Sequence, residues 1–253
     1  MKASTASGSI RTSFSPTLTR RHYASYKANN RRTPMSRLYG SLHSRAHRCA
    51  WMLKELNLSF EHVATNFTDG STHKPDFLKI NPNGRVPAFV SDEVCLFESL
   101  AINLHLARRH PSDLSPATLV EEALVTQWSF WVVTEIEKPL LLAAANSILF
   151  DADKRNPSEL KVALTKLGRP FSVLDRHLSE HAYLLGDRFT VADLNVAAVL
   201  TLARLGSLDL SEWPRLDEWL GSCLERPAAA DWKTISFRVP RPETDLGMLA
   251  MFV

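Results

Sequence analysis

The pattern of apolar and polar positions changes its period once along the chain. From residue 36 to residue 110, short apolar runs of strand length alternate with segments in which apolar residues recur at helical spacing. The order is β-α-β-α-β-β-α, with strands expected at residues 38–40, 60–63, 85–90 and 94–97 and helices at residues 44–56, 76–79 and 98–109. This alternation predicts a compact sheet with flanking helices.

The pattern that follows is helical throughout. Segments of helical spacing cover residues 118–149, 157–181, 190–205 and 213–226, and no strand-like alternation appears among them. Residues 111–117 (PSDLSPA) separate the two patterns and are typical of a linker. We therefore predict an α/β domain at residues 36–110 and an all-α domain at residues 118–236.

The two ends of the chain lack a sustained period. Residues 1–34 are rich in Ser, Thr, Arg and Asn, contain seven Lys or Arg and no Asp or Glu, and are expected to be disordered. Two explanations fit this basic leader: an organelle transit peptide, or a mis-assigned start, since Met35 stands directly before the ordered pattern. The Pro-containing tail at residues 237–253 is expected to lie on the surface.

Composition and charge narrow the class of protein. The chain has 253 residues, of which 45% are apolar, so it can bury a sizeable core. Its formal net charge of +3 becomes −4 once the seven positive charges of residues 1–34 are removed, so no nucleic-acid-binding face is expected on the body. The longest uncharged apolar stretch, residues 139–150, is shorter than the roughly 20 residues that cross a bilayer. No membrane partner is expected either.

Cysteine usage indicates a reducing compartment. Cys49, Cys95 and Cys223 are odd in number and widely spaced, and they form neither a disulfide framework nor a CxxC pair. We expect a cytoplasmic protein, or a mitochondrial one if residues 1–34 are a genuine transit peptide.

Four motifs, in order along the chain, resemble those of the cytosolic glutathione S-transferases, in particular the serine-type theta and zeta classes. They are residues 38–48 (LYGSLHSRAHR), 81–89 (NPNGRVPAF), 97–102 (FESLAI) and 186–193 (GDRFTVAD), and residues 213–227 also resemble the family's closing helix. The resemblance implies a thioredoxin-like N-terminal domain with a mixed four-stranded sheet, followed by an all-α C-terminal domain. It further implies a homodimer, without a metal, that transfers the glutathione thiolate to a hydrophobic electrophile or reduces a small peroxide.

The chemistry of glutathione explains why a hydroxyl group is wanted in the first motif. Glutathione reacts as a thiolate, and a free thiol has a pKa near 8.5, so only a few per cent is ionised at neutral pH. Lowering that pKa by about two units takes roughly 2.7 kcal/mol, and one hydrogen bond to a charged group supplies about 1.5–3 kcal/mol. A single hydroxyl at a helix start is therefore sufficient in size.

The resemblance assigns this catalytic role to Ser44, at the start of the predicted helix 44–56. Arg48, one turn further along, would add positive potential. Ser41 is the rival hydroxyl, and a serine that merely caps the helix is the other explanation of Ser44. No cysteine occupies the active position, because Cys49 falls farther along the helix.

The second and third motifs supply candidate contacts for the rest of glutathione. The resemblance implies a cis Val86–Pro87 bond, with the backbone of Val86 pairing with the cysteinyl backbone of glutathione like an added strand. It also implies that Glu98 and Ser99, at a helix start, bind the γ-glutamyl group. An edge-strand proline and a simple helix cap are the ordinary alternatives. The basic groups expected near the glycyl carboxylate are Arg85, His73 and Lys74.

Other notable residues of the second domain are assigned structural roles. Thr190 to Asp193 has the logic of a capping box before a helix that is apolar nearly all round, so Asp193 is expected to be structural. Residues 177–181 fit the H-x-x-E-H zinc pattern, but they close a helix and no third ligand is evident. For the wall of the electrophile pocket the candidates are Trp128, Phe130 and Trp131, which could equally belong to the core.

Three classes of function remain open. The first is the glutathione-transferring enzyme, and the second is a non-catalytic scaffold of the same fold that serves protein assembly. The third, a nucleic-acid binder that uses the basic leader, rests only on residues 1–34. The intact set of Ser44, Val86–Pro87 and Glu98–Ser99 favours the enzyme, since a scaffold need not retain all three. The identity of the electrophile stays open.

Overall fold

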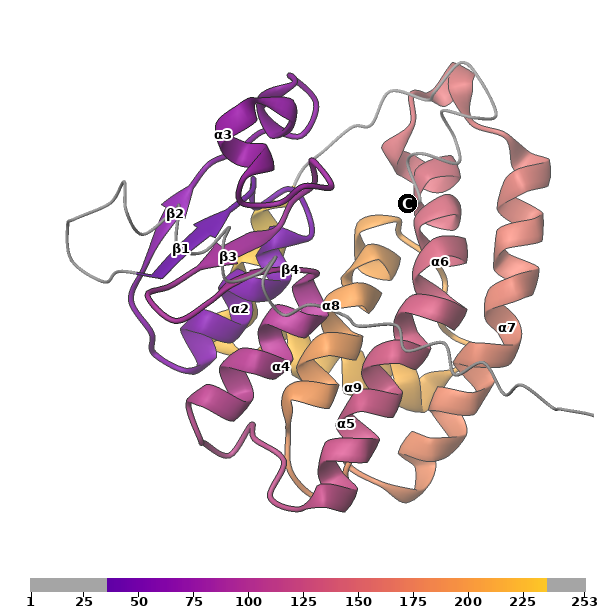
Figure 1. Cartoon of the computed structure of the whole chain (residues 1–253). Helices are drawn as coiled ribbons and strands as arrows, with labels where there is room; N and C mark the ends of the chain where they lie inside the picture. Colours follow the sequence, from indigo (N-terminus) through magenta and orange to yellow (C-terminus); the bar gives the residue numbers. More distant parts are fainter. Residues whose placement is uncertain (1–35, 236–253) are drawn as a thin grey trace, which may run out of the picture.

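The computed structural model describes residues 36–235, and the expectations for residues 1–34 and 237–253 lie outside that range. Within it, a sheet with flanking helices is followed by a helical domain (Figure 1). The predicted fold class, an α/β thioredoxin-like domain before an all-α domain, is confirmed.

The sheet has four strands in the order β2-β1-β3-β4. They are β1 (Ser36–Tyr39), β2 (Phe60–Val63), β3 (Ala88–Val90) and β4 (Cys95–Phe97). Strand β1 pairs in parallel with β2, whereas β1 with β3 and β3 with β4 are antiparallel, so the sheet is mixed as predicted. The strand expected at residues 85–90 begins only at Ala88, because Pro87 has no N–H group to donate to a neighbouring strand.

Three helices accompany the sheet: α2 (Ala46–Glu55), α3 (Pro75–Leu78) and α4 (Ser99–Arg109). The prediction that the first of them starts at Ser44 was wrong by two residues. The N–H and the hydroxyl of Ser44 both donate to the carbonyl oxygen of Ser41, at 2.9 and 2.6 Å, which closes a tight turn before the helix begins. Helix α2 packs against α4 on one side and against the helical domain on the other.

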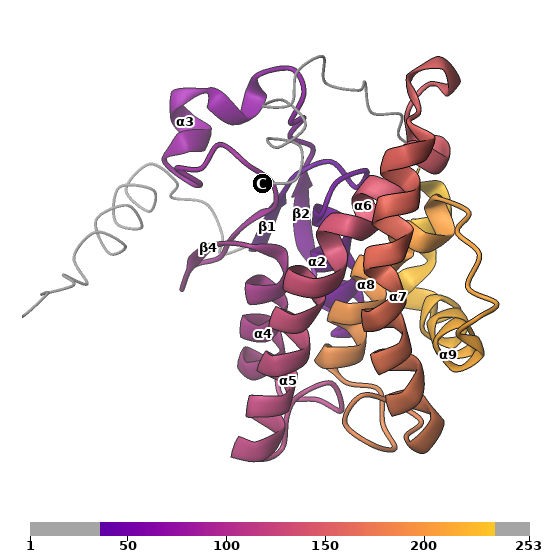
Figure 2. The same cartoon turned by 90° about the vertical axis from the view of Figure 1, so that its right-hand side faces the viewer.

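The helical domain begins with one long, uneven helical run. It consists of α5 (Leu119–Trp131), a π-helical segment (Val132–Glu137), α6 (Lys138–Ala144) and a second π-helical segment (Ala145–Leu149). It continues with α7 (Pro157–Glu180), α8 (Val191–Leu205), α9 (Pro214–Leu224) and a 3₁₀ segment (Pro227–Thr234). Helix α7 packs along α6 and α9 on the outside of the domain (Figure 2).

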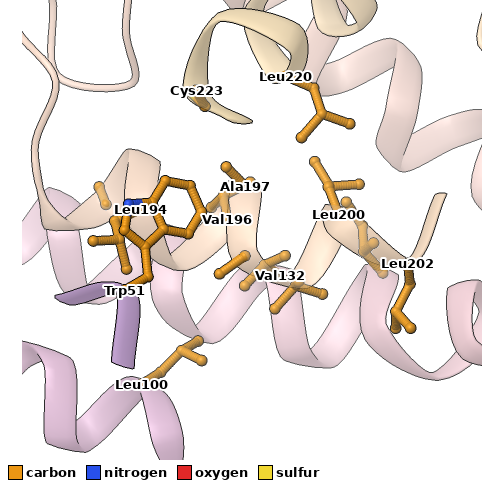
Figure 3. Packing of buried hydrophobic residues seen from close by; sticks show 14 of the residues in the cluster. Trp51, Leu100, Val132, Leu194, Val196, Ala197, Leu200, Leu202, Leu220 and Cys223 are labelled. Carbon is orange, nitrogen blue, oxygen red and sulfur yellow. The ribbon is translucent and has the colours of Figure 1, made fainter. Parts of the chain in front are cut away.

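Helix α8 is the centre of the core. Every residue from Val191 to Ala203 is buried, as its apolar sequence predicts. Side chains from both domains meet there: Trp51 of α2 and Leu100 of α4 approach it from the first domain, and Leu220 of α9 from the second (Figure 3). The two domains therefore share one continuous core.

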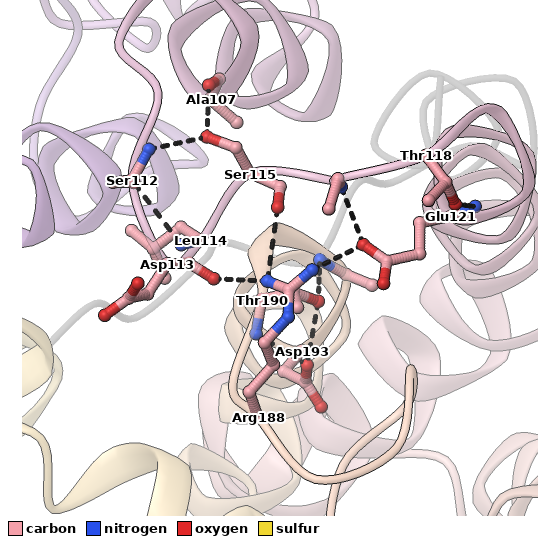
Figure 4. Close-up of polar contacts among 12 residues, drawn as sticks. Ala107, Ser112, Asp113, Leu114, Ser115, Thr118, Glu121, Arg188, Thr190 and Asp193 are labelled. Carbon is pink, nitrogen blue, oxygen red and sulfur yellow. Dashed lines mark hydrogen bonds and ion pairs between the residues drawn. The ribbon is translucent and has the colours of Figure 1, made fainter.

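The predicted capping box at the start of α8 is confirmed. The Thr190 hydroxyl accepts from Ala192 N–H. Asp193 Oδ2 accepts from Thr190 N–H at 2.9 Å and from the Thr190 hydroxyl at 3.0 Å (Figure 4). The other oxygen, Oδ1, accepts from Leu184 N–H at 2.8 Å and from Trp219 Nε1 at 3.2 Å. Asp193 is a structural hub.

The segment between the two domains is held by the same motif. The guanidinium group of Arg188 donates to the carbonyl oxygens of Asp113 and Ser115 and forms an ion pair with Glu121 (Figure 4). The N–H group of Val191 donates to the carbonyl oxygen of Leu114, whose side chain is buried. The predicted linker is thus tied to the start of α8.

No helix within residues 36–235 is both long enough and apolar enough to cross a membrane.

Candidate active site

The candidate site begins in the turn that follows β1. Pairing of β1 with β2 continues past the strand, since Gly40 N–H donates to Val63 and Ser41 N–H to the carbonyl of Thr65, both at 3.1 Å. The Ser44 hydroxyl donates to the Ser41 carbonyl and accepts from Ala46 N–H at 3.2 Å. Ser44 thus sits at the helix entry with its proton already directed at a neutral acceptor. The rival, Ser41, accepts at Oγ from His43 N–H at 3.2 Å.

The loop of Val86 lies against this turn. Gly40 has a φ of 134°, and a Cβ atom added there would lie 2.8 Å from Ala46 Cβ, 3.0 Å from Val86 Cβ and 3.5 Å from Ser44 Oγ. The Val86–Pro87 bond is cis, as the resemblance implies. Two motifs that are far apart in sequence therefore converge on Gly40, and only a residue without a side chain fits between them.

Replacing Gly40 by alanine should separate the turn from the Val86 loop. We expect the KM for glutathione to rise by at least roughly tenfold, because a tenfold loss needs only about 1.4 kcal/mol and two contacts at or below 3.0 Å must be relieved. Steady-state kinetics with glutathione varied will measure the change. Gly186→Ala is the matched control, because Gly186 has a φ of 116° but nothing within 4 Å of the added carbon. An unchanged KM in Gly40→Ala would contradict the proposed convergence.

The predicted basic groups lie on or beside the loop of residues 81–85. Asn81 organises this loop, with its side-chain amide donating to the Arg85 carbonyl at 2.6 Å. Gly84 has a φ of 63°, and the His73 ring lies 3.2 Å from where a Cβ on Gly84 would be. The structure therefore brings His73 to the loop, and His73, Lys74 and Arg85 are all exposed.

The third motif leaves the Glu98 carboxylate exposed at a helix start. Glu98 has a φ of 70°, unusual for a residue with a side chain, and it precedes α4 without capping it through that side chain. Simple capping therefore does not account for the acid. Ser99 is buried, and its hydroxyl accepts from Arg48 Nη1 at 3.4 Å.

Arg48, expected to add positive potential, is buried in an ion pair. It is 2% exposed and its Nη2 pairs with Glu137 Oε1 at 2.8 Å. The same oxygen accepts from Arg45 Nε at 2.6 Å. Although burial favours the neutral acid, the two guanidinium groups lower the pKa of Glu137 to about 2. Two cations and one anion leave a net positive charge beside Ser44.

Glu137 was missed by sequence reasoning. A signal was available, because Glu137 directly follows the apolar residue Ile136 in a segment that must pack against the first domain. An acid buried at such a position needs a positively charged partner.

Two neighbours on α2 are held neutral by burial. The ring of His47 lies close to two carbonyl oxygens. Its Nδ1 is 2.8 Å from the carbonyl oxygen of Ser44, and its Nε2 is 3.3 Å from that of Ala198. Burial, aided by the charge of Arg48, lowers the pKa of His47 to about 4. Burial also raises the pKa of the Cys49 thiol, which agrees with the expectation that this cysteine is not the nucleophile.

The three aromatic residues named for the wall of the electrophile pocket differ in exposure. Trp128 is buried and its ring packs edge-on against Trp131 and His177, so it belongs to the core. Phe130 is 66% exposed. His177 directs Nε2 at the carbonyl of Leu184, and no group of three potential metal ligands occurs within residues 36–235.

Comparisons with known proteins agree on one family. The profile described as "Glutathione S-transferase, N-terminal domain" matches residues 35–108, and the profile "Glutathione S-transferase, C-terminal domain" matches residues 138–227. Glutathione S-transferase 3 and glutathione S-transferase 1 of Zea mays are 33% and 34% identical to this chain. Each alignment covers 76% of this chain, and 90% and 92% of the respective relatives. The structure of a glutathione S-transferase-I bound with lactoylglutathione superimposes with a TM-score of 0.73 at 28% identity, over 81% of this chain and 100% of that one.

Proposed function

The chain belongs to the glutathione S-transferase family and is a glutathione-conjugating enzyme, and from that premise we propose that Ser44 holds the reacting thiolate. The observation that carries the proposal is the convergence at Gly40, where the Ser44 hydroxyl and Val86 approach the same point from different motifs. Val86, Glu98 and Ser99 would then bind the peptide portion of glutathione.

The reaction needs only a modest rearrangement at Ser44. The hydroxyl turns from the neutral carbonyl of Ser41 to the sulfur, exchanging an ordinary hydrogen bond for a charge-assisted one of about 1.5–3 kcal/mol. The net positive charge of the Arg45, Arg48 and Glu137 group adds to that stabilisation. The thiol releases its proton to solvent. The sulfur then attacks the electrophilic carbon and the C–S bond forms. With a halide substrate the halide ion departs with the electron pair of the broken bond, and with an α,β-unsaturated carbonyl the resulting enolate takes a proton from solvent.

We propose the remaining contacts with glutathione from the positions of the other candidate residues around this turn. An edge backbone at Val86 pairs with the cysteinyl unit. The exposed carboxylate of Glu98 faces the γ-glutamyl ammonium, and Ser99 with the first amides of α4 takes its carboxylate. His73, with Arg85 and Lys74 as exposed basic groups, serves the glycyl carboxylate.

Several broader properties belong to the same proposal. The second substrate is a hydrophobic electrophile, a small peroxide being a further substrate class. The protein acts in the cytoplasm as a homodimer that binds neither nucleic acid nor membrane and uses no metal. Support for the dimer comes from exposed apolar side chains on both domains, among them Phe97 and Phe130. We also propose domain boundaries at residues 36–110 and 118–236.

A binding and turnover experiment separates this enzyme from a non-catalytic scaffold. We expect retention on immobilised glutathione, release by free glutathione, and conjugation of at least one electrophile in a panel of aryl halides, alkyl halides and α,β-unsaturated carbonyls. Peroxides in the same panel test the second activity. Retention without turnover of any substrate would favour the scaffold, and failure to be retained would contradict the site itself.

A further inference from the structure

One carboxylate oxygen of Glu137, in the helical domain, accepts hydrogen bonds from the guanidinium groups of two arginines in the first domain. Glu137 Oε1 lies 2.6 Å from Arg45 Nε and 2.8 Å from Arg48 Nη2. Arg48 is deeply buried and Glu137 nearly so, whereas the Arg45 side chain is 37% exposed. Glu137 closes the π-helical segment that follows α5, while both arginines belong to α2 or its entry.

The two arginines lead to two different parts of the proposed glutathione site. Arg45 directly follows Ser44, so its contact with Glu137 anchors the turn that carries the thiol-binding hydroxyl. Arg48 donates through Nη1 to the hydroxyl of Ser99, the residue proposed for the γ-glutamyl carboxylate, while its Nη2 holds Glu137. Glu137 is thus the common point of two contacts that end at two parts of the same tripeptide.

We propose that Glu137 is a positioning residue that holds the thiol-binding turn of Ser44 and the γ-glutamyl-binding Ser99 in a fixed relation. It touches no substrate and acts through Arg45 and Arg48. The inference rests on the proposed roles of Ser44 and Ser99, and it deepens the proposed function by assigning the helical domain a part in binding glutathione.

Physical chemistry supports a positioning role over a purely stabilising one. Taking charges out of water is costly, so a buried ion pair is often no more stabilising than apolar residues of similar volume. A guanidinium group, by contrast, donates from fixed positions of a rigid planar fork, so its contact with Glu137 restricts the orientation of each arginine. The π-helical segment, whose turns are wider than those of an α-helix, also aims Glu137 differently from an unbroken α-helix, and such segments occur frequently at functional sites.

The substitution Glu137→Gln distinguishes positioning from a direct effect of charge. Removing an anion near the thiol would by itself favour the thiolate and lower the pKa of the bound thiol. Positioning predicts the opposite: the pKa of the bound thiol rises by roughly one unit because Ser44 is less well held. The KM for glutathione rises about tenfold because Ser99 is displaced. Ultraviolet absorbance of the thiolate, titrated with glutathione bound, and steady-state kinetics measure the two effects.

Arg45→Lys provides a second test that does not threaten the fold, since Arg45 is partly exposed. It keeps the positive charge but loses the planar guanidinium contact to Glu137. We expect the pKa of the bound thiol to rise by about half a unit, while the KM for glutathione stays within about twofold because the Arg48–Ser99 arm is intact. If Glu137→Gln fails to fold, Arg45→Lys still tests whether the contact with Glu137 holds the thiol-binding turn of Ser44.

Glu122→Gln is the matched control, because it removes a surface ion pair with Arg108 from the same helical run. It should change neither quantity. A bound-thiol pKa that falls in Glu137→Gln, or that stays at the wild-type value in Arg45→Lys, would overturn the proposal. Ser44→Ala distinguishes a failure of the proposed function from a failure of this inference. If Ser44→Ala leaves the pKa of the bound thiol unchanged, the role of Ser44 is wrong. If Ser44→Ala changes that pKa but Glu137→Gln and Arg45→Lys do not, the role of Glu137 is wrong.

Discussion

Replacing Ser44 by alanine is expected to slow conjugation at neutral pH by roughly ten- to a hundredfold while leaving glutathione binding nearly intact. The thiolate would lose a charge-assisted hydrogen bond of about 1.5–3 kcal/mol, which raises the pKa of the bound thiol by about one to two units. Val86, Glu98 and Ser99 still hold the peptide, so the KM for glutathione should change little. Titration of the ultraviolet absorbance of the bound thiolate reads the pKa directly.

The pH dependence of the rate adds a second signature. At neutral pH the wild-type thiol is ionised and the variant's is not, whereas near pH 9 solvent ionises both, so much of the lost rate should return as the pH rises. Ser41→Ala is the control, because its hydroxyl accepts from His43 N–H within the turn. A titration that Ser41→Ala shifts and Ser44→Ala does not would mean that the reacting hydroxyl is Ser41.

The largest loss of stability is expected from Asp193→Ala. This substitution leaves the N–H groups of Leu184 and Thr190 and the indole N–H of Trp219 without an acceptor in a buried region. Each unpaired buried donor costs about 1–3 kcal/mol. Allowing for local relaxation, we expect a loss of about 3–5 kcal/mol in the free energy of unfolding, a large part of an ordinary domain's stability.

Thermal and urea unfolding will measure this loss, with a decrease in melting temperature of about 10 °C for a body of this size. Asp209→Ala serves as the control, because Asp209 makes one comparable bond to Ser211 N–H at an exposed position. It should cost about 1 kcal/mol or less. If the two variants unfold alike, the network around Asp193 contributes no more than an ordinary exposed turn.

Much of the fold could be predicted because its elements are specified locally. The strand at residues 60–63 and the extent of α4 follow from apolar periodicity, and the start of α8 follows from its capping residue Thr190, signals that act over a few positions. The errors arose where a local rule met a competing local contact. Ser44 bonds to Ser41 and so delays the helix to Ala46, and Pro87 delays β3 to Ala88.

The candidate site also contains residues that the sequence named and one that it did not. The resemblance of the sequence motifs to those of the family named Ser44, Val86, Glu98 and Ser99 as candidates, and their roles stay a prediction. It did not identify Glu137, which pairs with Arg48, the residue that was expected to add positive potential. Trp128, named as a possible pocket wall, packs in the core against His177.

What the sequence by itself determined, then, is the order of elements, the family to which the motifs belong and the residues that local geometry places at helix starts and turns. Only the tertiary structure decided which charges meet. Arg45 and Arg48 share an oxygen of Glu137, about 90 positions away. Helix α8 packs against both α2 and the π-helical segment Val132–Glu137, which brings these residues together. The sequence does not tell whether a single charged residue is buried. Once Arg48 is buried it needs an anion beside it, because a cation taken out of water is stable only when it is paired.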